Sequence, residues 1–444
     1  MKIIFEEERK FLNEKLNIDL PTDCWRKVSK IYLDPTCSKP LYTFKAVSGT
    51  IKITKDNSKL FEGYEQKKMV DLIKDNNKTI DNLVKFSVES TVDYILNNQD
   101  HLFVISHSGG KDSTVIYDIW LKALDVLKVN HKDVFDKLKW EINFSNTSNE
   151  TADTYKIIKK LPKDKLRILN PKVGFYQWVT KVKNYFVPSV MVRNCCSTYK
   201  EGQITKVYDK TEAITMIIGV RKYESVKRGN YDMVMDESFR IKLFGSSNIP
   251  EKWVKFAPII DWHDEEIWYY MVRENLDINK QYYIGFNRCG CLICPYQSDY
   301  IDLLIQEYYP KQWERWMGIL EKNYTIKNIE NRLKWSLEEW KSGKWKQGTS
   351  KEQEIIHRKA TPERIKELAE IKGINEEMAE KYFNQVCDCG KKLNPAELAM
   401  SFKFYGRNSS KLECKKCFCE NNSISSKDYA QKVSEFSESG CNLF

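Results

Sequence analysis

The sequence predicts an α/β protein whose central domain is a mostly parallel twisted sheet with helices on both faces. The first observation is that strand-like and helix-like segments alternate along the middle of the chain, an order typical of parallel sheets. Strands are expected at 102–106, 139–144, 166–169, 213–218 and 255–260, and helices at 113–127, 150–160 and 174–186. The second observation is a glycine turn between the first of these strands and its helix. Because ligands of such sheets bind at the carboxyl ends of the strands, the loops that follow the strands should line one pocket.

The chain of 444 residues is long enough for several domains. We expect a small N-terminal α+β module at 1–80, the central domain at 81–300, a helical extension at 301–380, a cysteine-rich module at 381–420 and a mobile tail at 421–444. Hydrophobic residues make up 41% and aromatic residues 13% of the chain, which argues against general disorder.

Charge and hydropathy narrow the class of partner. The net charge of +10 fits a polyanion, either a nucleotide or a nucleic acid. The N-terminal segment has no long apolar stretch, and no other segment nears the length of a membrane span. We therefore expect a soluble cytoplasmic protein with no membrane partner.

The segment before the central domain gives fewer signals. Short strands are expected at 31–33, 41–44 and 50–54, followed by a helix whose apolar face runs from Val84 to Leu96. Cys24 and Cys37 have no second cysteine pair nearby and are interpreted as ordinary buried or free thiols.

The glycine turn is the clearest functional signal. It consists of Ser108, Gly109, Gly110, Lys111, Asp112 and Ser113, between an apolar strand and an amphipathic helix. Glycines allow the backbone to approach a ligand closely, and the amides at a helix start attract anions. Lys111 adds a positive charge and the two serines add hydroxyl donors. This pattern predicts a phosphate-binding loop, although it lacks the spacing of a Walker loop.

Two later loops are expected to join this pocket, and a third to be structural. Residues 143–151 supply amides and hydroxyls at a helix start. The loop after strand 213–218 carries Arg221, Lys222, Lys227 and Arg228, and arginine forks suit phosphate or sulfate oxygens. Residues 258–268 join a strand to a helix with an acidic first turn, so we interpret this segment as mainly structural and His263 as a capping or surface residue.

Thirteen cysteines against five histidines favour thiolate-only metal sites in a reducing compartment. In the C-terminal module, the spacing of two cysteine pairs predicts a zinc-ribbon-like site with four thiolates. Its ligands would be Cys387, Cys389, Cys414 and Cys417, with Cys419 close enough to compete. Aromatic residues between 300 and 375 could stack on bases, but their helical spacing favours a role in the core.

Five blocks occur in one order and together resemble a known family. They are SGGKDS at 108–113, R-x-C-C-x-x-x-K at 193–200, G-x-R-x-x-E-S-x-x-R at 219–228, P-I-x-D-W at 258–262 and G-C-x-x-C-P at 290–295. The stretch from about 84 to 320 is similar to the phosphoadenosine phosphosulfate (PAPS) reductase family of the PP-loop ATP pyrophosphatase superfamily. Within that family, it most resembles the members that act in DNA phosphorothioation. Residues 146–148 depart from the family's D-T-G segment, since Asn146 replaces the acid and Ser148 the glycine.

The resemblance implies a fold like that of the adenine nucleotide alpha hydrolases, with ATP and Mg²⁺ at the loop. Lys111, Asp112 and Arg221 would then be catalytic, and the remaining loop residues and Arg228 would bind the nucleotide. It also implies a four-iron four-sulfur cluster held by Cys195, Cys196, Cys291 and Cys294, while Cys289 could replace one ligand of the pair. Zinc on the same four thiolates is the alternative.

Three functions fit these implications. The first is ATP-dependent activation of an acceptor by adenylation, followed by sulfur insertion with sulfur from a donor such as a cysteine desulfurase. We expect the acceptor to be a nucleic acid. The second is reduction of PAPS or of adenosine phosphosulfate (APS) to sulfite. The intact Lys111 and Asp112 argue against it, and Cys441 lacks the ECGLH context of the reductases. The third is a non-catalytic nucleotide-binding partner in a defence or mobile-element system.

Overall fold

The computed structural model describes residues 1–47, 49–204, 207–208, 213–225, 228–236, 252–356, 358–373, 375–406, 409 and 411–438. They form two compact units. One unit contains Met1–Phe186 and Arg193–Ile319, and the other contains Val187–Val192 and Leu320–Phe444. Every nucleotide-site residue predicted above that the structure describes lies in the first unit, together with the first set of cysteines.

The first unit is built on a six-stranded sheet with the order β10-β11-β9-β6-β7-β8. Its strands are β6 (Leu102–Ser106), β7 (Trp140–Ser145), β8 (Leu166–Leu169), β9 (Ala213–Ile217), β10 (Val234–Asp236) and β11 (Lys252–Phe256). All neighbours pair in parallel except β10, which is antiparallel to β11 at the edge. The predicted α/β class with a mostly parallel sheet is confirmed.

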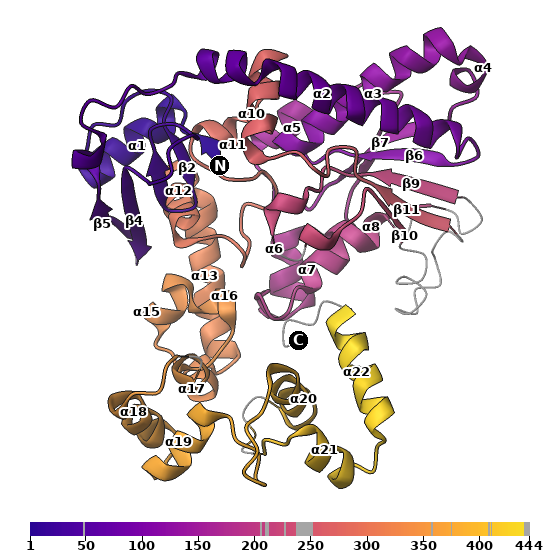
Figure 1. Cartoon of the computed structure of the whole chain (residues 1–444). Helices are drawn as coiled ribbons and strands as arrows, with labels where there is room; N and C mark the ends of the chain where they lie inside the picture. Colours follow the sequence, from indigo (N-terminus) through magenta and orange to yellow (C-terminus); the bar gives the residue numbers. More distant parts are fainter. Residues whose placement is uncertain are drawn as a thin grey trace. The chain divides into compact units, whose positions relative to one another are not determined.

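Burial explains the strand and helix patterns. Phe103, Val104 and Ile105 of β6 are all fully buried, as expected for a strand covered on both faces. The long helices α2 (Met69–Leu96) and α3 (Lys111–Asn130) lie along one face of the sheet, and the short α6 (Phe175–Gln177), α7 (Asn194–Cys196) and α8 (Gly202–Ile204) lie on the other (Figure 1).

The expected strand at 255–260 begins and ends earlier in the structure. β11 stops at Phe256, and Ile260 turns back to donate its amide to the Ala257 carbonyl. Pro258 has no amide to donate to a strand ladder, which is a reason for the strand to end before it. The edge strand β10 was not predicted, because three residues are too few to show an alternating pattern.

The N-terminal segment forms a second, antiparallel sheet in the order β1-β2-β3-β4-β5. Its elements are β1 (Lys2–Ile3), α1 (Glu6–Leu16), β2 (Trp25–Lys27), β3 (Lys30–Tyr32), β4 (Tyr42–Val47) and β5 (Thr50–Asp56). Cys24 and Cys37 are buried free thiols, as predicted. The boundary predicted at residue 80, between the N-terminal module and the central domain, does not separate two compact units. It falls inside the continuous helix α2, and both sheets belong to one unit.

Short helices complete the first unit and position its loops. They are α4 (Lys132–Phe135), α5 (Ala152–Ile158), α10 (Asp264–Arg273), α11 (Lys280–Tyr283) and α12 (Asp299–Tyr308). Single turns of other helix types occur at η1 (Ser58–Phe61), η2 (Trp178–Val182), η3 (Ser197–Glu201), η4 (Lys222–Glu224) and η5 (Arg228–Asn230). Helix α13 (Pro310–Ile326) runs through the chain boundary between the two units.

The described part of the second unit is helical. Its elements are α14 (Ile329–Leu333), α15 (Leu337–Glu339), η6 (Trp340–Lys344), α16 (Trp345–Gln347), α17 (Lys351–Ile356), α18 (Pro362–Lys372), α19 (Glu376–Asn384), α20 (Pro395–Tyr405), α21 (Lys415–Asn421) and α22 (Ser426–Glu438). Trp335 and Trp340 are buried in this unit, as Trp316 is in the first, so these aromatic residues belong to the core. The tail predicted to be mobile instead contains α22, whose Tyr429 ring lies 5.4 Å from the Phe418 ring.

Candidate functional site

The phosphate-binding loop predicted at 108–113 lies between β6 and α3, at the carboxyl end of a central strand. Gly109 has φ +74°, and a Cβ there would meet the Thr154 side chain at 3.0 Å, so this position requires glycine. The hydroxyls of Ser108 and Ser113 lie 3.3 Å apart across the turn. The loop is thus the tight strand-to-helix turn that the sequence predicts.

The backbone amides of the loop each meet a polar side-chain atom. Gly109 donates to His107 Nδ1 at 3.2 Å, Gly110 to Ser113 Oγ at 3.1 Å and Lys111 to the Tyr282 hydroxyl at 3.0 Å. Burial lowers the pKa of His107 to about 4, so its ring stays neutral and Nδ1 can accept this bond at physiological pH. These partners fix the direction of the amides at the start of α3.

Two buried cations share two carboxylates beside the loop. Asp112 accepts from Lys111 Nζ at 2.7 Å and from Arg221 Nε at 2.8 Å. Asp264 accepts from Arg221 Nη2 at 2.6 Å, lies 3.8 Å from Lys111 Nζ, and also accepts from the Met1 amino group at 2.8 Å. Arg221 is only 1% exposed. The structure therefore brings together all three residues predicted to be catalytic.

The pKa values of the two acids follow from this charge cluster. Burial alone would raise the pKa of Asp112, but Lys111 and Arg221 outweigh it and hold the pKa below its ordinary value. Burial acts on Asp264 in the same way, and its pKa is lowered by the Met1 amino group, Lys111 and Arg221. Both carboxylates are ionised at neutral pH, so they can balance cations or ligate a metal ion.

The segment interpreted as structural contributes a site residue. Asp264 is the first residue of α10, and its acidic first turn does fit the helix dipole. The structure shows that its carboxylate also faces Arg221 and Lys111, so the purely structural interpretation is wrong for Asp264. His263 precedes α10, and its ring stacks on Tyr223 with ring centroids 3.7 Å apart.

The two other described cations of the Arg221 loop, Lys222 and Arg228, pair with acids outside the charge cluster. Arg228 pairs with Glu224 and is 40% exposed, and Lys222 pairs with Asp261 at 2.7 Å. Lys227 falls outside the described residues. Arg228 reaches the cluster only through Glu224, which lies 3.8 Å from Arg221, so its geometry gives no direct support to the predicted binding role.

Asn279 supports the loop from behind and was not predicted. Its side-chain amide donates to the Gly109 carbonyl at 3.0 Å and to Thr154 Oγ1 at 3.2 Å, while its oxygen caps α11 by accepting from Gln281 N. An asparagine before a short helix is a capping signal in any sequence. No sequence pattern connects it to a loop 170 residues away.

Four predicted cluster ligands line a cavity next to the loop. The cavity measures about 80 Å³, and the thiols in its wall belong to Cys195, Cys196, Cys289, Cys291 and Cys294. Cys195 and Cys196 come from α7, and their mutual hydrogen bond, followed by burial, raises the pKa of Cys195. The two sequence blocks that carry these cysteines therefore meet in space.

Two cations stand among these thiols. Lys200 lines the same cavity, and the nearby Cys291 sulfur raises its pKa. Arg288 places Nη2 at 3.6 Å from the Cys294 sulfur. Iron–sulfur clusters on four thiolates carry net negative charge, so the donor set and its cations fit such a group.

Cys289 takes a different place from the other four thiols. Its Cβ lies 3.7 Å from the position that a Cβ on Gly110 would occupy, and its thiol hydrogen-bonds with the Tyr282 hydroxyl. Burial raises its pKa, so it is a neutral thiol. Cys289 thus lines the cavity and also lies beside the phosphate-binding loop, and its role as a substitute ligand stays a prediction.

Asn149 fixes the loop that carries the second cysteine pair. It accepts from Leu292 N through its backbone carbonyl at 2.5 Å, donates from its side chain to the Ile293 carbonyl at 2.8 Å, and accepts from Ile293 N at 3.3 Å. Thr147 Oγ1 lies 3.5 Å from the Cys291 sulfur. The segment that departs from the D-T-G pattern therefore positions the cysteine loop.

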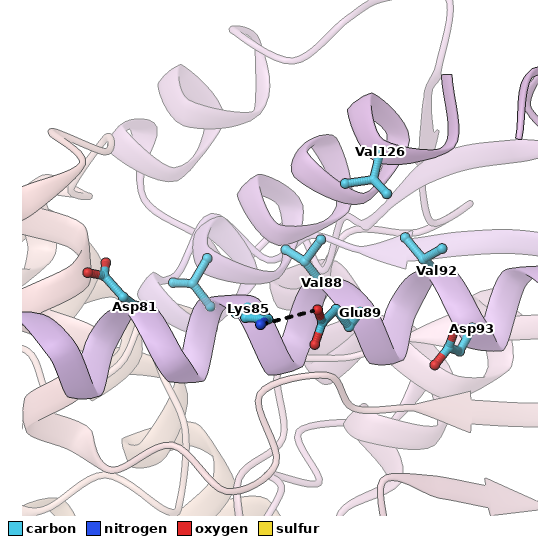
Figure 2. A pocket seen from close by; sticks show the side chains of 8 residues that line it. Asp81, Lys85, Val88, Glu89, Val92, Asp93 and Val126 are labelled. Carbon is cyan, nitrogen blue, oxygen red and sulfur yellow. Dashed lines mark ion pairs between the residues drawn. The ribbon is translucent and has the colours of Figure 1, made fainter. Parts of the chain in front are cut away.

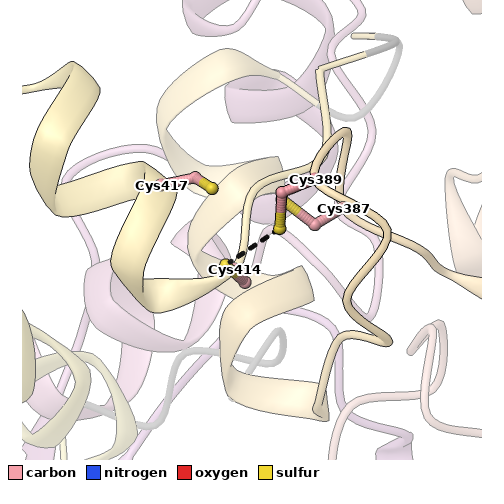
Figure 3. A group of neighbouring side chains, drawn as sticks. All are labelled: Cys387, Cys389, Cys414 and Cys417. Carbon is pink, nitrogen blue, oxygen red and sulfur yellow. Dashed lines mark hydrogen bonds between the residues drawn. The ribbon is translucent and has the colours of Figure 1, made fainter.

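The C-terminal cysteines form the tighter group (Figure 3). The sulfur atoms of Cys387, Cys389, Cys414 and Cys417 all lie within 4.8 Å of one another, and those of Cys389 and Cys414 are 3.8 Å apart. Tetrahedral zinc with bonds of about 2.3 Å places its sulfurs about 3.8 Å apart, so the donor set fits this ion. Cys419 packs in a neighbouring apolar cluster with Phe418 and does not join the group.

The module around this group is not a β-ribbon, and that part of the prediction is wrong. In the described residues of the module, strand pairing is limited to one bridge between Val386 and Lys392. Cys414 precedes α21, and Cys417 lies one turn later on that helix. The sequence spacing predicted that these four cysteines form one group, but a spacing of this kind is compatible with either helices or strands after a knuckle.

A second cavity lies away from all of these residues (Figure 2). It measures about 610 Å³ on the surface of α2 and α3 and is lined by Val84, Val88, Val92 and Val126 with charged residues at its edge. Lys85 and Glu89 form an ion pair there at 3.9 Å. None of the predicted site residues lines it.

Comparison with known proteins identifies the region that carries the site. Residues 102–297 match the family model described as the phosphoadenosine phosphosulfate reductase domain. An uncharacterized protein of Methanocaldococcus jannaschii is 28% identical over 277 residues, which cover 61% of this chain and 52% of that protein. The chain thus spans about half the length of this relative.

One further relative and one similar solved structure have named activities. An adenosine 5'-phosphosulfate reductase of Shouchella clausii is 24% identical over 172 residues, 36% of this chain and 64% of that protein. The crystal structure of a phosphoadenylyl-sulfate reductase from Candida auris, in a phosphate complex, aligns with a TM-score of 0.32 at 16% identity and covers 49% of this chain and 93% of that one. Among the described helices, none has the length and apolar character needed to cross a bilayer.

Proposed function

We propose that this chain, whose residues 102–297 form a phosphoadenosine phosphosulfate reductase domain, is an enzyme that uses ATP to activate an acceptor for sulfur insertion. One observation carries the proposal. Lys111 and Arg221, 110 positions apart in sequence, are buried on the same two carboxylates beside an intact glycine loop. This arrangement suits the phosphates of a nucleotide that must be held while its bonds change.

Several groups in and beside the loop would bind the nucleotide phosphates. The amides of Gly109, Gly110 and Lys111 lie at the start of α3, where anions are favoured. Lys111 supplies a point charge, and Arg221 a planar fork that matches phosphate oxygens. Asp112 and Asp264 offer the carboxylate oxygens that Mg²⁺ prefers, and the bound ion would neutralise phosphate charge.

The proposed chemistry has two displacements. An oxygen of the acceptor attacks the α-phosphorus of ATP, the bond to the β-phosphate oxygen breaks, and pyrophosphate leaves with that oxygen. A sulfur nucleophile from a donor then attacks the acceptor atom that bears the adenylate, and AMP leaves with the original acceptor oxygen. The cations at the loop stabilise the charge that develops on the leaving pyrophosphate.

The acceptor is proposed to be a nucleic acid. The net charge of +10 supports this choice, because a basic protein attracts a polyanion. The sulfur donor would be a partner such as a cysteine desulfurase. Cys195, Cys196, Cys291 and Cys294 would hold an iron–sulfur cluster, which supplies redox or sulfur-binding chemistry when present. Cys387, Cys389, Cys414 and Cys417 would hold a structural zinc ion.

A second candidate is sulfonucleotide reduction. The relative from Shouchella clausii named as an adenosine 5'-phosphosulfate reductase favours it. The retained Lys111 and Asp112 argue against it, since a substrate without pyrophosphate does not need them. Cys441 lies outside the described residues, so the geometry of a terminal cysteine does not bear on the choice.

The two candidates are separated by their products. Anaerobically purified protein is incubated with MgATP and nucleic acid, and pyrophosphate is measured; in parallel it is incubated with APS or PAPS and a thiol reductant, and sulfite is measured. We expect pyrophosphate and no sulfite. The Lys111→Ala variant should lose pyrophosphate release, while Lys222→Ala, which removes a partly exposed lysine paired with Asp261, should retain it. Sulfite formed without ATP would instead establish the reductase.

A third candidate, a non-catalytic nucleotide-binding partner, predicts ATP binding without either product. In that case wild-type protein would bind MgATP but release neither pyrophosphate nor sulfite with any of the acceptors offered. The buried pair of Lys111 and Asp112 gives this candidate no support, because binding alone does not require a charge network of this kind.

A further inference from the structure

The N-terminal segment contains a buried charge network. Glu8 is fully buried and pairs with Lys2 and with Arg26, whose Nε lies 2.6 Å from Glu8 Oε1. Tyr300 adds a hydroxyl donor to the same carboxylate at 3.1 Å. Burial alone would raise the pKa of Glu8, but Arg26 and Lys2 keep it below its ordinary value. The carboxylate is therefore ionised and binds both cations tightly.

The two cations also hold a distant segment of the chain. Lys2 Nζ donates to the Tyr282 carbonyl at 3.1 Å, and Arg26 Nη2 donates to the Gly285 carbonyl at 2.6 Å. These bonds span 280 and 259 positions in sequence. The stretch from Tyr282 to Gly285, at the end of α11, is thus fixed at both ends by charge-assisted hydrogen bonds, which are the stronger kind.

Close packing adds to these bonds. Gly285 has φ +109°, and a Cβ there would lie 3.1 Å from Glu8 and 2.9 Å from Leu304, so glycine permits the approach. On the other side, the Phe5 ring packs against Tyr283 at 4.4 Å and against Trp268 at 5.7 Å. Trp268 in turn meets the Tyr282 ring edge-on at 5.1 Å. The Tyr282 ring therefore has little freedom to turn.

The hydroxyl of this fixed ring ends at the phosphate-binding loop. It accepts the Lys111 amide at 3.0 Å and lies 3.3 Å from the position of a Cβ on Gly110. It also hydrogen-bonds with the Cys289 thiol. Tyr282 is 1% exposed. The Tyr282 hydroxyl thus hydrogen-bonds both with the Lys111 amide of the loop and with the Cys289 thiol at the cysteine cavity.

We propose that Tyr282 is a positioning residue for the phosphate-binding loop, and that Lys2, Glu8 and Arg26 of the N-terminal segment set its position. This inference rests on the proposed function, since it assigns the loop to ATP. It gives the N-terminal sheet a role that its sequence does not indicate. The segment would act on the pyrophosphate part of the nucleotide, because that part meets the start of α3.

The first test removes the hydroxyl alone. For Tyr282→Phe we expect the Kd for MgATP to rise about five-fold, the effect of one hydrogen bond of about 1 kcal/mol. The Kd for AMP, which has no pyrophosphate, should stay unchanged. Both are measured by titration calorimetry on the full chain. A role in stability alone would change both nucleotides alike, so the ATP-to-AMP ratio separates positioning from folding.

The matched control is Tyr283→Phe, the next residue of α11, whose ring packs on Phe5. It should leave both constants unchanged. An unchanged ATP-to-AMP ratio in Tyr282→Phe, or tighter ATP binding, would overturn the inference. Failure of the wild-type chain to bind ATP would overturn the proposed function, and the inference with it.

The second test asks whether the effect travels through the network. Arg26→Lys keeps the charge but loses the fork that joins Glu8 to the Gly285 carbonyl. We expect it to weaken MgATP binding and to add nothing when combined with Tyr282→Phe, because both changes act through one hydroxyl. Arg9→Lys is the control, since Arg9 pairs with Glu6 and the Leu20 carbonyl in the same segment. Additive effects of Arg26→Lys and Tyr282→Phe would refute this route.

Discussion

His107 illustrates how one neutral side chain can shape a predicted anion site. Its Nδ1 accepts the Gly109 amide, and its ring meets Tyr117 edge-on at 6.0 Å. A protonated ring could not accept this bond, and it would add a further buried positive charge close to the loop. The low pKa of about 4, caused by burial, keeps the acceptor available throughout the physiological range.

This shift predicts a pH dependence of stability. The folded pKa of about 4 lies below the unfolded value of 6.5, so between these values the unfolded chain binds more protons. The stability contributed by His107 is therefore present above pH 6.5 and is lost as the pH falls towards 4. The full loss is about 3 kcal/mol. Urea unfolding at pH 7 and pH 4.5 measures it.

The matched variant for this prediction is His107→Asn, which keeps an acceptor but does not titrate. It should be less stable at pH 7, because the contact with Tyr117 is lost, yet its stability should change less between the two pH values. Carboxylates that titrate in this range affect both proteins equally. Equal pH dependence in the two proteins would contradict the assignment to His107.

At the scale of elements, the turn between β7 and α5 positions the second cysteine pair. The Asn149 side chain makes two of the three hydrogen bonds that hold residues 292–293. Asn149→Ala should leave the Ile293 amide and carbonyl without these partners in a buried setting, at a cost of about 2 kcal/mol. We expect a lower thermal midpoint and reduced iron per chain after anaerobic purification.

The control for this variant is Asn170→Ala. Asn170 is exposed and its contact is with Asn146, away from the cysteine loop. It should keep both the thermal midpoint and the metal content of the wild type. Full iron content in Asn149→Ala would show that the turn does not support the site.

The elements differ in how far the sequence predicted them. The strand β6, the loop and the helix α3 were predictable because a buried strand, two glycines and a 3.6-residue apolar period are local signals. Asp264, Asn279 and Tyr282 were not, since each reaches the loop from more than 150 positions away and carries no motif. Local patterns predict elements, whereas the side chains that meet in a site depend on tertiary contacts.

The same limit appears in the cysteines. Spacing sufficed to predict Cys387, Cys389, Cys414 and Cys417 as one group, because knuckle pairs are local. It did not predict that helices rather than a ribbon would surround them. The sequence could not distinguish the surroundings of Cys289 from those of Cys291, because it does not show in which direction two side chains of one loop point.

At the scale of the whole molecule, the two candidate metal sites belong to different compact units. All four thiols of each set come from a single unit. The first set lies beside the phosphate-binding loop, and the second set joins α21 to the turn at 387–390. The C-terminal group also contributes to an apolar cluster through Cys387 and Cys414, which pack with Leu393, Leu398 and Leu412. Loss of its metal should therefore loosen the core of the second unit.

This separation gives the last prediction. Cys414→Ser should lose zinc and lower the unfolding temperature of the second unit, because closed four-thiolate zinc sites contribute directly to folding. It should keep the iron content and the MgATP affinity of the wild type. Cys291→Ser should do the reverse and lose iron but keep zinc. Metal analysis and calorimetric scans of both variants measure these effects. Loss of the same metal in both variants would refute the assignment of iron to one unit and zinc to the other, because one ion type would then depend on thiols from both units.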